Sequence, residues 1–399
     1  MSFGWFDLIL LIGVTQGFFL SLLLLRKAGN LKANRILAFL IIAYSLFILN
    51  ALFVRSSLFG KYPHVTVLLG ELPLLFGPLH YFYAKFLIDK RLRFSYKEWL
   101  QLLPFLVFKV YTIPAYFMSG PELLAFIRNM KEVGDPVFDI LGWVIAVQGL
   151  TYMIMTLALI RKYTQNIKEN YSTIDEINLN WLKNITFMAL SVWIVVFLEE
   201  VLALFNSNLL GGNAQLIAML TAVFIYALGY LGLSKSEIFL QKIITDWKTI
   251  DRESERSDFK SDDQSLRDRR SRKYQKSGLS ADKAKRIVDS LLQLMKKEKP
   301  YTDSSLTLTR LADSLKISPH NLSEAINTQL QQTFFDFVNQ YRVEQVKRDL
   351  SDPQKKHFTF LALALEAGFN SKSSFNAIFK KHSGMTPSEY RQGAKGSYA

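Results

Sequence analysis

Long apolar runs dominate the first 235 positions of the chain, whereas the remaining sequence mixes apolar and polar residues at short intervals. Seven runs are separated by short polar joins, and they cover residues 5–25, 36–54, 65–88, 99–118, 137–160, 181–205 and 213–233. Each run approaches the ~20 residues with which a helix crosses about 30 Å of hydrocarbon. Because seven such helices would leave a soluble protein without a polar surface, we expect residues 1–235 to form a seven-span domain in the lipid bilayer.

Lys and Arg are unevenly shared between the joins. Eleven lie in the joins after the first, third and fifth runs, and four lie in the other joins. Positively charged joins stay in the cytoplasm, so we expect the N-terminus outside and the C-terminus inside. The pattern predicts a multi-pass protein of the bacterial inner (cytoplasmic) membrane, whose C-terminal half shares the cytoplasm with DNA.

Ionisable residues interrupt several of the runs. Such side chains are costly in hydrocarbon and usually face the bundle interior or a watery cavity. They form either a sensing site or one interhelical ion pair accompanied by residues near the membrane surface. Because the outer joins are short, a signal would be a small molecule, a lipid, a proton or another membrane protein. The candidate sensing residues are Glu71, His80, Lys109, Glu199 and Glu200.

Two stretches connect the apolar half to the rest of the chain. Residues 236–250 carry apolar side chains at helical spacing and predict an amphipathic junction helix. This helix is either a stalk that pairs two protomers into a homodimer or a helix lying on the inner leaflet, and we favour the stalk. Residues 251–279 are dense in charged residues and serine, which predicts a flexible charged linker to a domain at 280–399.

The stretch over residues 359–391 has the pattern of a helix-turn-helix motif. An apolar helix ends at Gly368, where the left-handed cap position favours glycine. Ser371 then caps a second helix, whose apolar stripe is Phe375, Ile378 and Phe379. Two short helices joined by a glycine turn, with polar and basic residues on the outer face of the second, predict a DNA-reading unit.

A similar pattern occurs earlier in the domain. Ser280 caps one helix, Thr307 opens a second, and Ser318 with Pro319 begins a third. A long helix over residues 334–350 then leads to the motif at 359–391. These motifs, together with the tail GMTPSEYR, resemble the DNA-binding domain of the AraC/XylS transcription activators. The resemblance implies a seven-helix domain in which two helix-turn-helix units flank one rigid helix and enter successive major grooves of double-stranded DNA.

By position in the motifs, the resemblance places the two recognition helices at residues 320–328 and 372–381. Ala377 stands where members of the family often carry Arg, which puts base-by-base inference in doubt. Amide, hydroxyl, carboxylate and ammonium groups suit base edges, and cations suit phosphates. We predict base contacts from His320, Asn321, Ser323, Glu324, Lys372, Ser373 and Asn376, phosphate contacts from Lys380, Lys381 and Arg391, either role for Ser374, and an outward position for Asn327.

Composition and charge limit the partners and cofactors that we expect. The net charge of +14 favours polyanionic partners. The chain has no cysteine, and no two of its five histidines stand at metal-ligand spacing, so we expect neither metal nor cofactor.

The fold class we expect is all-α: a seven-transmembrane-helix bundle, a linker and an AraC-type double helix-turn-helix domain. No catalytic motif is present, so we expect no enzyme but a membrane-bound, sequence-specific transcription regulator that senses a signal in or across the membrane and controls promoters. The alternative is a transporter or membrane enzyme with an attached regulatory DNA-binding domain, which the proline-broken third and fourth runs would suit.

Overall fold

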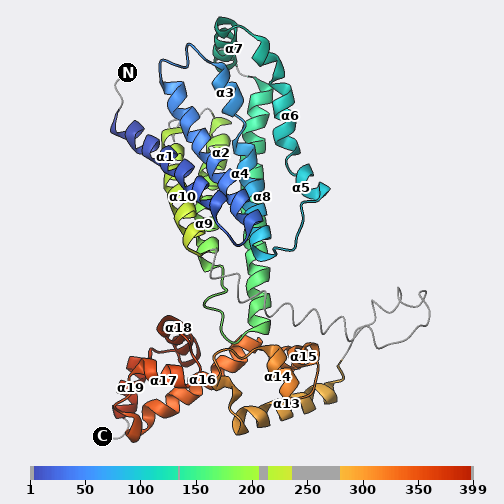
Figure 1. Cartoon of the computed structure of the whole chain (residues 1–399), viewed down its shortest axis with the longest axis vertical. Coiled ribbons are helices and arrows are strands. Elements are labelled where there is room, and N and C mark those ends of the chain that lie inside the picture. The colour runs from blue at the N-terminus through green and yellow to red at the C-terminus, as the bar shows by residue number, and fades with distance from the viewer. Residues whose placement is uncertain (1–3, 134, 206–213, 236–278, 397–399) are drawn as a thin grey trace, which may run out of the picture. The chain divides into compact units, whose positions relative to one another are not determined.

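The computed structural model describes residues 4–133, 135–205, 214–235 and 279–396, which are mainly helical, as Figure 1 shows. Among these residues the β-structure is one isolated antiparallel bridge between Tyr171 and Thr307. The chain divides into two compact units, residues 1–163 with 179–240 and residues 164–178 with 241–399. The predicted junction helix at 236–250 and the linker at 251–279, apart from Leu279, lie outside the described residues. The expected all-α class is confirmed for the described part of the chain.

The first unit, which we call the membrane unit, is a bundle of helices. Small residues allow close packing in it, because a Cβ added at Gly17 of α1 would meet Ser45 of α2 and one at Gly13 would meet Ala222 of α10. Its elements are α1 (Trp5–Arg26), α2 (Leu31–Arg55), α3 (His64–Leu69), α4 (Pro73–Ile88), α5 (Tyr96–Leu100), α6 (Leu103–Tyr111), η1 (Ile113–Phe117), α7 (Gly120–Val133), α8 (Pro136–Asn170), α9 (Asn180–Ala203) and α10 (Ala214–Lys235).

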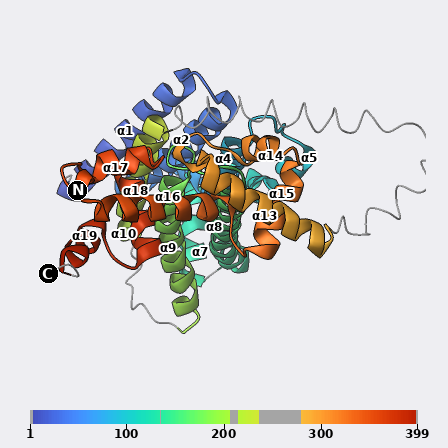
Figure 2. The same ribbon diagram turned by 90° about the horizontal axis from the view of Figure 1, so that it is seen from below.

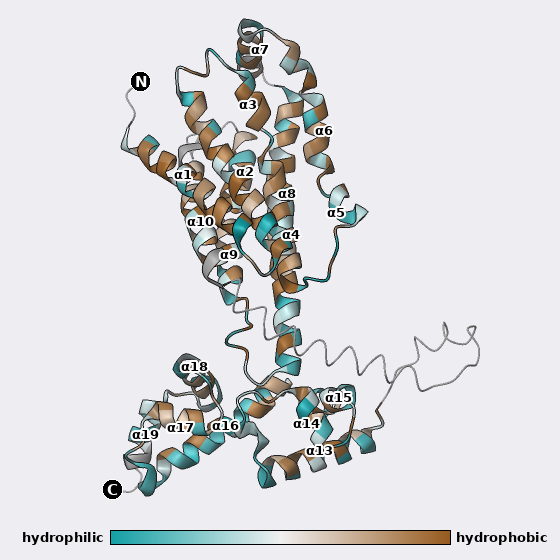
Figure 3. Ribbon diagram, in the orientation of Figure 1, coloured by the Kyte–Doolittle hydropathy of each residue, from teal (hydrophilic) through white to brown (hydrophobic). Residues whose placement is uncertain are grey.

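Large apolar side chains cover the outside of the membrane unit. Phe19 of α1, Phe39 of α2 and Ile154 of α8 are each more than half exposed, and Figure 3 shows hydrophobic colour along most of these helices. In water this surface would be an aggregation site, whereas in a bilayer it contacts lipid. Among the described residues, the helical segments whose length and composition suffice to cross a membrane are Trp5–Arg26, Leu31–Arg55, His64–Ile88, Pro136–Asn170 and Asn180–Ala203.

The expected count of seven membrane-spanning helices is not confirmed. The run at 99–118 is broken into α5, α6 and η1, and the longest piece has nine residues. Pro104 and Pro114 each stand in the first turn of a new piece, where the missing N–H costs nothing. The seventh run forms α10, whose described apolar part, Ile217–Gly232, is shorter than the five candidate spans.

The second unit, which we call the reading unit, contains the C-terminal helices. Seven α-helices occur between residues 279 and 396, as the resemblance implies. The side chains of Ser280, Thr307, Ser318, Thr333, Thr359 and Ser371 each accept a hydrogen bond from a backbone N–H in the first turn that follows. The elements are α13 (Ala281–Lys297), η2 (Pro300–Thr302), α14 (Leu308–Ser314), α15 (Pro319–Gln329), α16 (Phe334–Ser351), η3 (Pro353–Lys355), α17 (Phe360–Glu366), α18 (Lys372–Ser383) and α19 (Pro387–Gly396).

Helix α16 connects two hydrophobic cores within the reading unit. Phe337 and Val338 pack with α13, α14 and α15, whereas Val343 and Val346 pack with α17 and α18. Figures 1 and 2 both show α16 between these two groups of helices. The 18 residues of α16 give a length of about 27 Å. One rigid helix therefore carries both helix-turn-helix motifs.

Candidate nucleic-acid interface

The first helix-turn-helix motif consists of α14, a four-residue connection and α15. Leu311 and Ala312 of α14 and Leu322 of α15 have no exposed surface, because they form the core shared by the two helices. Lys316 takes a left-handed backbone conformation in the connection, with φ of 55°. The helix that follows begins with the Ser318 cap and Pro319, as predicted. Burial of one face leaves the opposite face of α15 available for a ligand.

The candidate readers of α15 form local contacts with one another. His320 is exposed, and its Nδ1 lies 3.8 Å from a carboxylate oxygen of Glu324. The amide nitrogen of Asn327 donates to the hydroxyl of Ser323 over 3.4 Å. Asn321, Ser323 and Glu324 are half-buried. The structure therefore places these five residues on one short helix, where four of their side chains pair at a spacing of four residues.

The second helix-turn-helix motif consists of α17, the turn at Gly368 and α18. Gly368 has φ of 96°, and a Cβ added there would lie 2.3 Å from the carbonyl oxygen of Tyr301. Phe375 and Phe379 have no exposed surface and fix α18 against α16 and α17. Burying each such ring contributes about 1.5–3 kcal/mol. The turn and the aromatic stripe together hold α18 in one orientation.

The outer face of α18 presents most of the second group of candidates. Lys372, Ser373, Asn376 and Lys380 are exposed, whereas Ser374 is half-buried. The N-terminal residues of a recognition helix are the ones that reach base edges in helix-turn-helix proteins. The first five residues of α18 thus offer an ammonium group, hydroxyl groups and an amide to a ligand.

Two predicted phosphate contacts are already engaged within the reading unit. The ammonium group of Lys381 lies 2.6 Å from a carboxylate oxygen of Asp336 on α16. Burial alone would raise the pKa of Asp336, but hydrogen bonds from Lys381 and Thr333 lower this pKa on balance. Arg391 donates to the carbonyl of Phe358 over 3.2 Å, and its guanidinium lies 4.2 Å from the centre of the Phe360 ring. Both cations therefore also stabilise the fold.

A buried arginine that the sequence pattern does not indicate lies in the middle of α16. Arg342 is 1% exposed. Burial lowers the pKa of its guanidinium to about 10, while the carboxylates of Asp303 and Asp175 raise it, so the group stays charged at neutral pH. A buried charge is tolerated only when its hydrogen-bonding capacity is satisfied. The surroundings of Arg342 must therefore supply several acceptors.

Those acceptors come partly from residues that the sequence reading assigned to a membrane-domain join. Arg342 donates to the carbonyl oxygens of Tyr301 (2.8 Å), Asp303 (2.9 Å) and Ser172 (3.0 Å). It also donates to the hydroxyls of Ser172 (3.1 Å) and Thr173 (3.2 Å). Ser172 belongs to the connection between α8 and α9, which forms part of the reading unit. This connection therefore completes the hydrogen bonding of a buried charge in the C-terminal domain.

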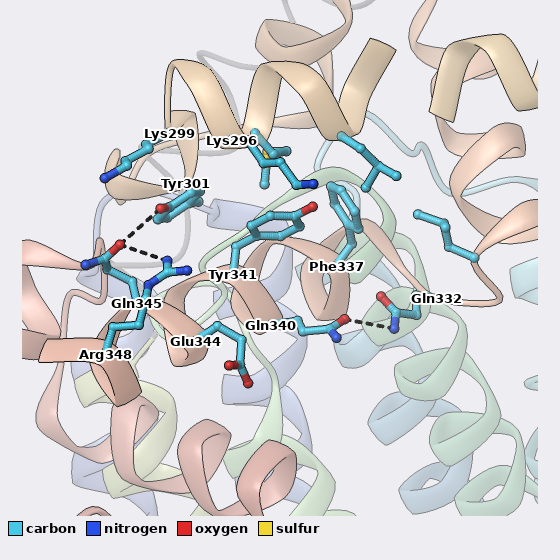
Figure 4. A pocket seen from close by; sticks show the side chains of 13 residues that line it. Lys296, Lys299, Tyr301, Gln332, Phe337, Gln340, Tyr341, Glu344, Gln345 and Arg348 are labelled. Atoms are coloured by element: carbon cyan, nitrogen blue, oxygen red, sulfur yellow. Dashed lines mark hydrogen bonds between the residues drawn. The ribbon is translucent and has the colours of Figure 1, made fainter. Parts of the chain in front are cut away.

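A pocket of about 800 Å³ lies between α13 and α16. Figure 4 shows Lys296, Lys299 and Arg348 at its edge and the rings of Tyr301 and Tyr341 within it. None of its lining residues is a candidate DNA contact. The pocket is thus separate from the candidate readers of α15 and α18.

The candidate sensing residues of the membrane unit occupy different environments. Glu71, between α3 and α4, forms an ion pair with Lys109 of α6 at 2.5 Å. An interhelical ion pair of this kind was one of the two interpretations of these residues, the other being a sensing site. His80 lies 3.1 Å from the hydroxyl of Thr186 on α9, and Glu200 lies against Gly142 of α8. Glu199 also interacts with the rest of the protein. A small apolar pocket of about 150 Å³, lined by residues that include Tyr44 and Trp193, contains none of these candidates.

Comparison with known proteins supports the C-terminal motif. Residues 311–393 match the sequence family described as "Helix-turn-helix domain". The Melibiose operon regulatory protein of Escherichia coli (strain K12) is 32% identical over 90 residues, which are 23% of this chain and 29% of that protein. An uncharacterized HTH-type transcriptional regulator of Staphylococcus aureus (strain COL) is 29% identical over 113 residues, 28% of this chain and 14% of that protein.

The chain therefore spans less than a third of the length of either of these curated relatives. The solved structure of a protein of unknown function from Listeria innocua matches 27% of this chain and 95% of its own, with 26% identity and a TM-score of 0.24. The predicted helix-turn-helix domain is confirmed over residues 311–393, and relatives that share it are named as regulators.

Proposed function

We propose that this chain is a membrane-bound, sequence-specific transcription regulator of the AraC type. Its membrane unit lies in the bacterial inner membrane and responds to a signal in or across the bilayer, and its reading unit binds double-stranded DNA in the cytoplasm. The observation that carries the proposal is the pair of capped helix-turn-helix motifs joined to one rigid helix, α16, within a segment that matches the helix-turn-helix family.

The geometry of α16 suits DNA reading. Successive major grooves on one face of a duplex are about 34 Å apart, so two reading helices need a fixed separation. A helix of about 27 Å whose two ends belong to different cores provides such a separation. The exposed apolar surface of the membrane unit supports the proposed location.

The proposal is tested with the full chain purified into lipid nanodiscs. A pool of genomic fragments is incubated with the protein at low ionic strength, and bound fragments are sequenced and footprinted. We expect two protected major-groove segments about one helical turn apart. Asn376→Ala should weaken binding to the recovered site about tenfold, as loss of one bidentate base contact does. Ser290→Ala, on the exposed face of α13, serves as the matched control and should bind like the wild type.

A full chain that ignores duplex DNA at low ionic strength would contradict the proposal. Binding without any footprint, unaffected by Asn376→Ala, would contradict sequence-specific reading through α18. Salt provides a further criterion, because for an interface built on several phosphate contacts the logarithm of the binding constant falls linearly with the logarithm of the salt concentration.

A further inference from the structure

We infer that residues 171–175, in the connection between α8 and α9, are an intramolecular inhibitor of DNA reading that docks on α16 and places the carboxylate of Asp175 at the start of α18. The inference rests on the proposed function, because it assumes that α18 reads DNA. It assigns a regulatory role to a connection that the sequence reading treated only as a polar join between membrane helices.

The docking is extensive for so short a segment. The backbone N–H and the hydroxyl of Ser172 both donate to the carbonyl of Leu306, at 3.2 Å and 2.7 Å. The carbonyl of Ser172 accepts from the side chains of Asn339 and Arg342, both at 3.0 Å. Ile174 packs against the core of the second helix-turn-helix motif. Ser172 is 1% exposed, so the segment is held by buried polar and apolar contacts together.

The end of the segment reaches the reading helix. The hydroxyl of Ser371, the N-cap of α18, donates to a carboxylate oxygen of Asp175 over 2.9 Å. The same Ser371 oxygen accepts from the backbone N–H of Ser374 and lies 3.3 Å from the hydroxyl of Ser373. Asp175 therefore stands beside the first turn of α18, where candidate base contacts begin.

At this position the carboxylate of Asp175 opposes DNA binding by α18. The N-terminus of a helix carries partial positive charge and unsatisfied N–H groups, and it favours anions such as phosphate. In helix-turn-helix proteins that same end of the recognition helix enters the major groove. A fixed carboxylate there repels the phosphates that flank the groove and satisfies a donor that DNA would use. Docking of residues 171–175 therefore lowers the affinity of α18 for DNA, and DNA binding in turn disfavours the docking.

The segment also provides a route for the signal. Its two ends continue into α8 and α9, and the membrane unit contains α8 up to residue 163 and all of α9. A change in the spacing or rotation of these two helices pulls directly on the contacts of Ser172 and Asp175. A ligand that favours the undocked segment would raise DNA affinity, and by linkage DNA would raise the affinity for that ligand equally.

The chain has no cysteine, so an engineered disulfide can lock the segment without competing thiols. Tyr171 and Thr307 form an antiparallel bridge, and residues opposed in this way have Cα atoms about 4.5–5.5 Å apart, within the range a disulfide spans. The double variant Tyr171→Cys/Thr307→Cys in nanodiscs is compared oxidised and reduced. Both the oxidised and the reduced form lack the Thr307 cap, so a difference in DNA affinity between them reports the disulfide alone.

We expect the disulfide to form readily and the oxidised protein to bind a 40-base-pair random-sequence duplex at least about tenfold more weakly than the reduced protein, with recovery on reduction. If the disulfide does not form, the docking is wrong. If it forms and affinity does not change, the docking is structural and the inhibitory role is wrong. If the reduced double variant and the wild type both ignore DNA while the disulfide still forms, the proposed function fails, and with it the regulatory role.

A charge variant tests the role of Asp175 separately. Asp175→Asn keeps an acceptor for Ser371 but removes the negative charge beside α18. We expect affinity for the same duplex to rise about 3- to 30-fold, from one unit charge acting on phosphates several ångströms away. Asp289→Asn removes one charge from the exposed face of α13 and should change affinity less than about twofold. Equal effects of the two variants would overturn the local role of Asp175.

Discussion

At the scale of single residues, burial explains which core positions the sequence predicts and which it does not. The long helix expected at 334–350 forms α16, and its apolar residues Phe337, Val338 and Val346 are all in the core. Arg342 was overlooked because arginine is almost never fully buried unless paired. Its acceptors are backbone carbonyls and hydroxyls from distant parts of the chain, and the sequence around Arg342 does not predict them. Individual polar contacts in the core are therefore the least predictable level.

Arg342 gives the first prediction at this scale. Arg342→Lys keeps the charge but loses the planar fork of donors, leaving buried acceptors near Ser172 and Asp303 unpaired. We expect the reading unit to lose about 3 kcal/mol of stability. Hydrogen exchange of the α16 amides in the full chain measures this loss. Arg310→Lys, at a mostly exposed ion pair with Asp303, is the matched control and should cost less than about 1 kcal/mol. Equal exchange in the two variants would contradict the buried role.

The ion pair between Asp336 and Lys381 predicts a pH effect. The pKa of Asp336 is lower than its ordinary value in the folded protein, because hydrogen bonds from Lys381 and Thr333 outweigh burial. A carboxylate with a lowered folded-state pKa stabilises the fold above its ordinary pKa of about 4, and this contribution disappears as the pH falls through the folded-state pKa. The stability advantage of the wild type over Asp336→Asn should therefore shrink below about pH 4. Hydrogen exchange of α18 against pH checks it; an advantage that persists at pH 2 would contradict it.

At the scale of elements, features that depend on neighbouring residues could be predicted from the sequence, whereas features that depend on contacts between distant segments could not. The caps at Ser280, Thr307, Ser318 and Ser371 were predicted from neighbouring residues alone, because a cap depends on the first turn that follows it. The run at 99–118 does not form one unbroken helix, although its hydropathy resembles that of one, because its prolines begin new pieces. The docking of residues 171–175 depends on tertiary contacts that sequence spacing does not encode.

The turn of the second helix-turn-helix motif gives a prediction at this scale. Gly368 and Gly384 both have positive φ, of 96° and 78°, but only Gly368 is crowded, by the Tyr301 carbonyl. Gly384→Ala should cost about 1–2 kcal/mol, the penalty of the left-handed conformation. Gly368→Ala should cost about 3 kcal/mol or more, because overpacking is added, and it displaces the carbonyl that accepts from Arg342. Chemical denaturation followed by helical circular dichroism compares them; equal costs would refute the crowding.

At the scale of the whole molecule, one compact unit contains residues far apart in the sequence, and this constrains the membrane topology. Residues 164–178 and the described residues 279–396 belong to the same unit, so the proposed function requires both to lie on the same side of the membrane. The distribution of Lys and Arg independently predicts a cytoplasmic position for the connection after α8. The proposed function then predicts that the chain between Asn178 and Leu279 crosses the bilayer an even number of times. Because α9 is one candidate span, we predict that α10 is a second crossing, despite its shorter described apolar part.

Single cysteines test this topology, since the wild-type chain has none. Glu169→Cys follows the apolar part of α8, Ser388→Cys lies on α19, and Arg128→Cys lies on α7, before α8 begins; all three positions are exposed. A membrane-impermeant maleimide added to intact spheroplasts should label only Arg128→Cys, because α8 separates it from the other two. Permeabilised cells should show labelling at all three positions. Labelling of Glu169→Cys and Ser388→Cys from opposite sides would mean that α10 does not cross, and it would make the contact between Ser172 and Arg342 impossible in the cell.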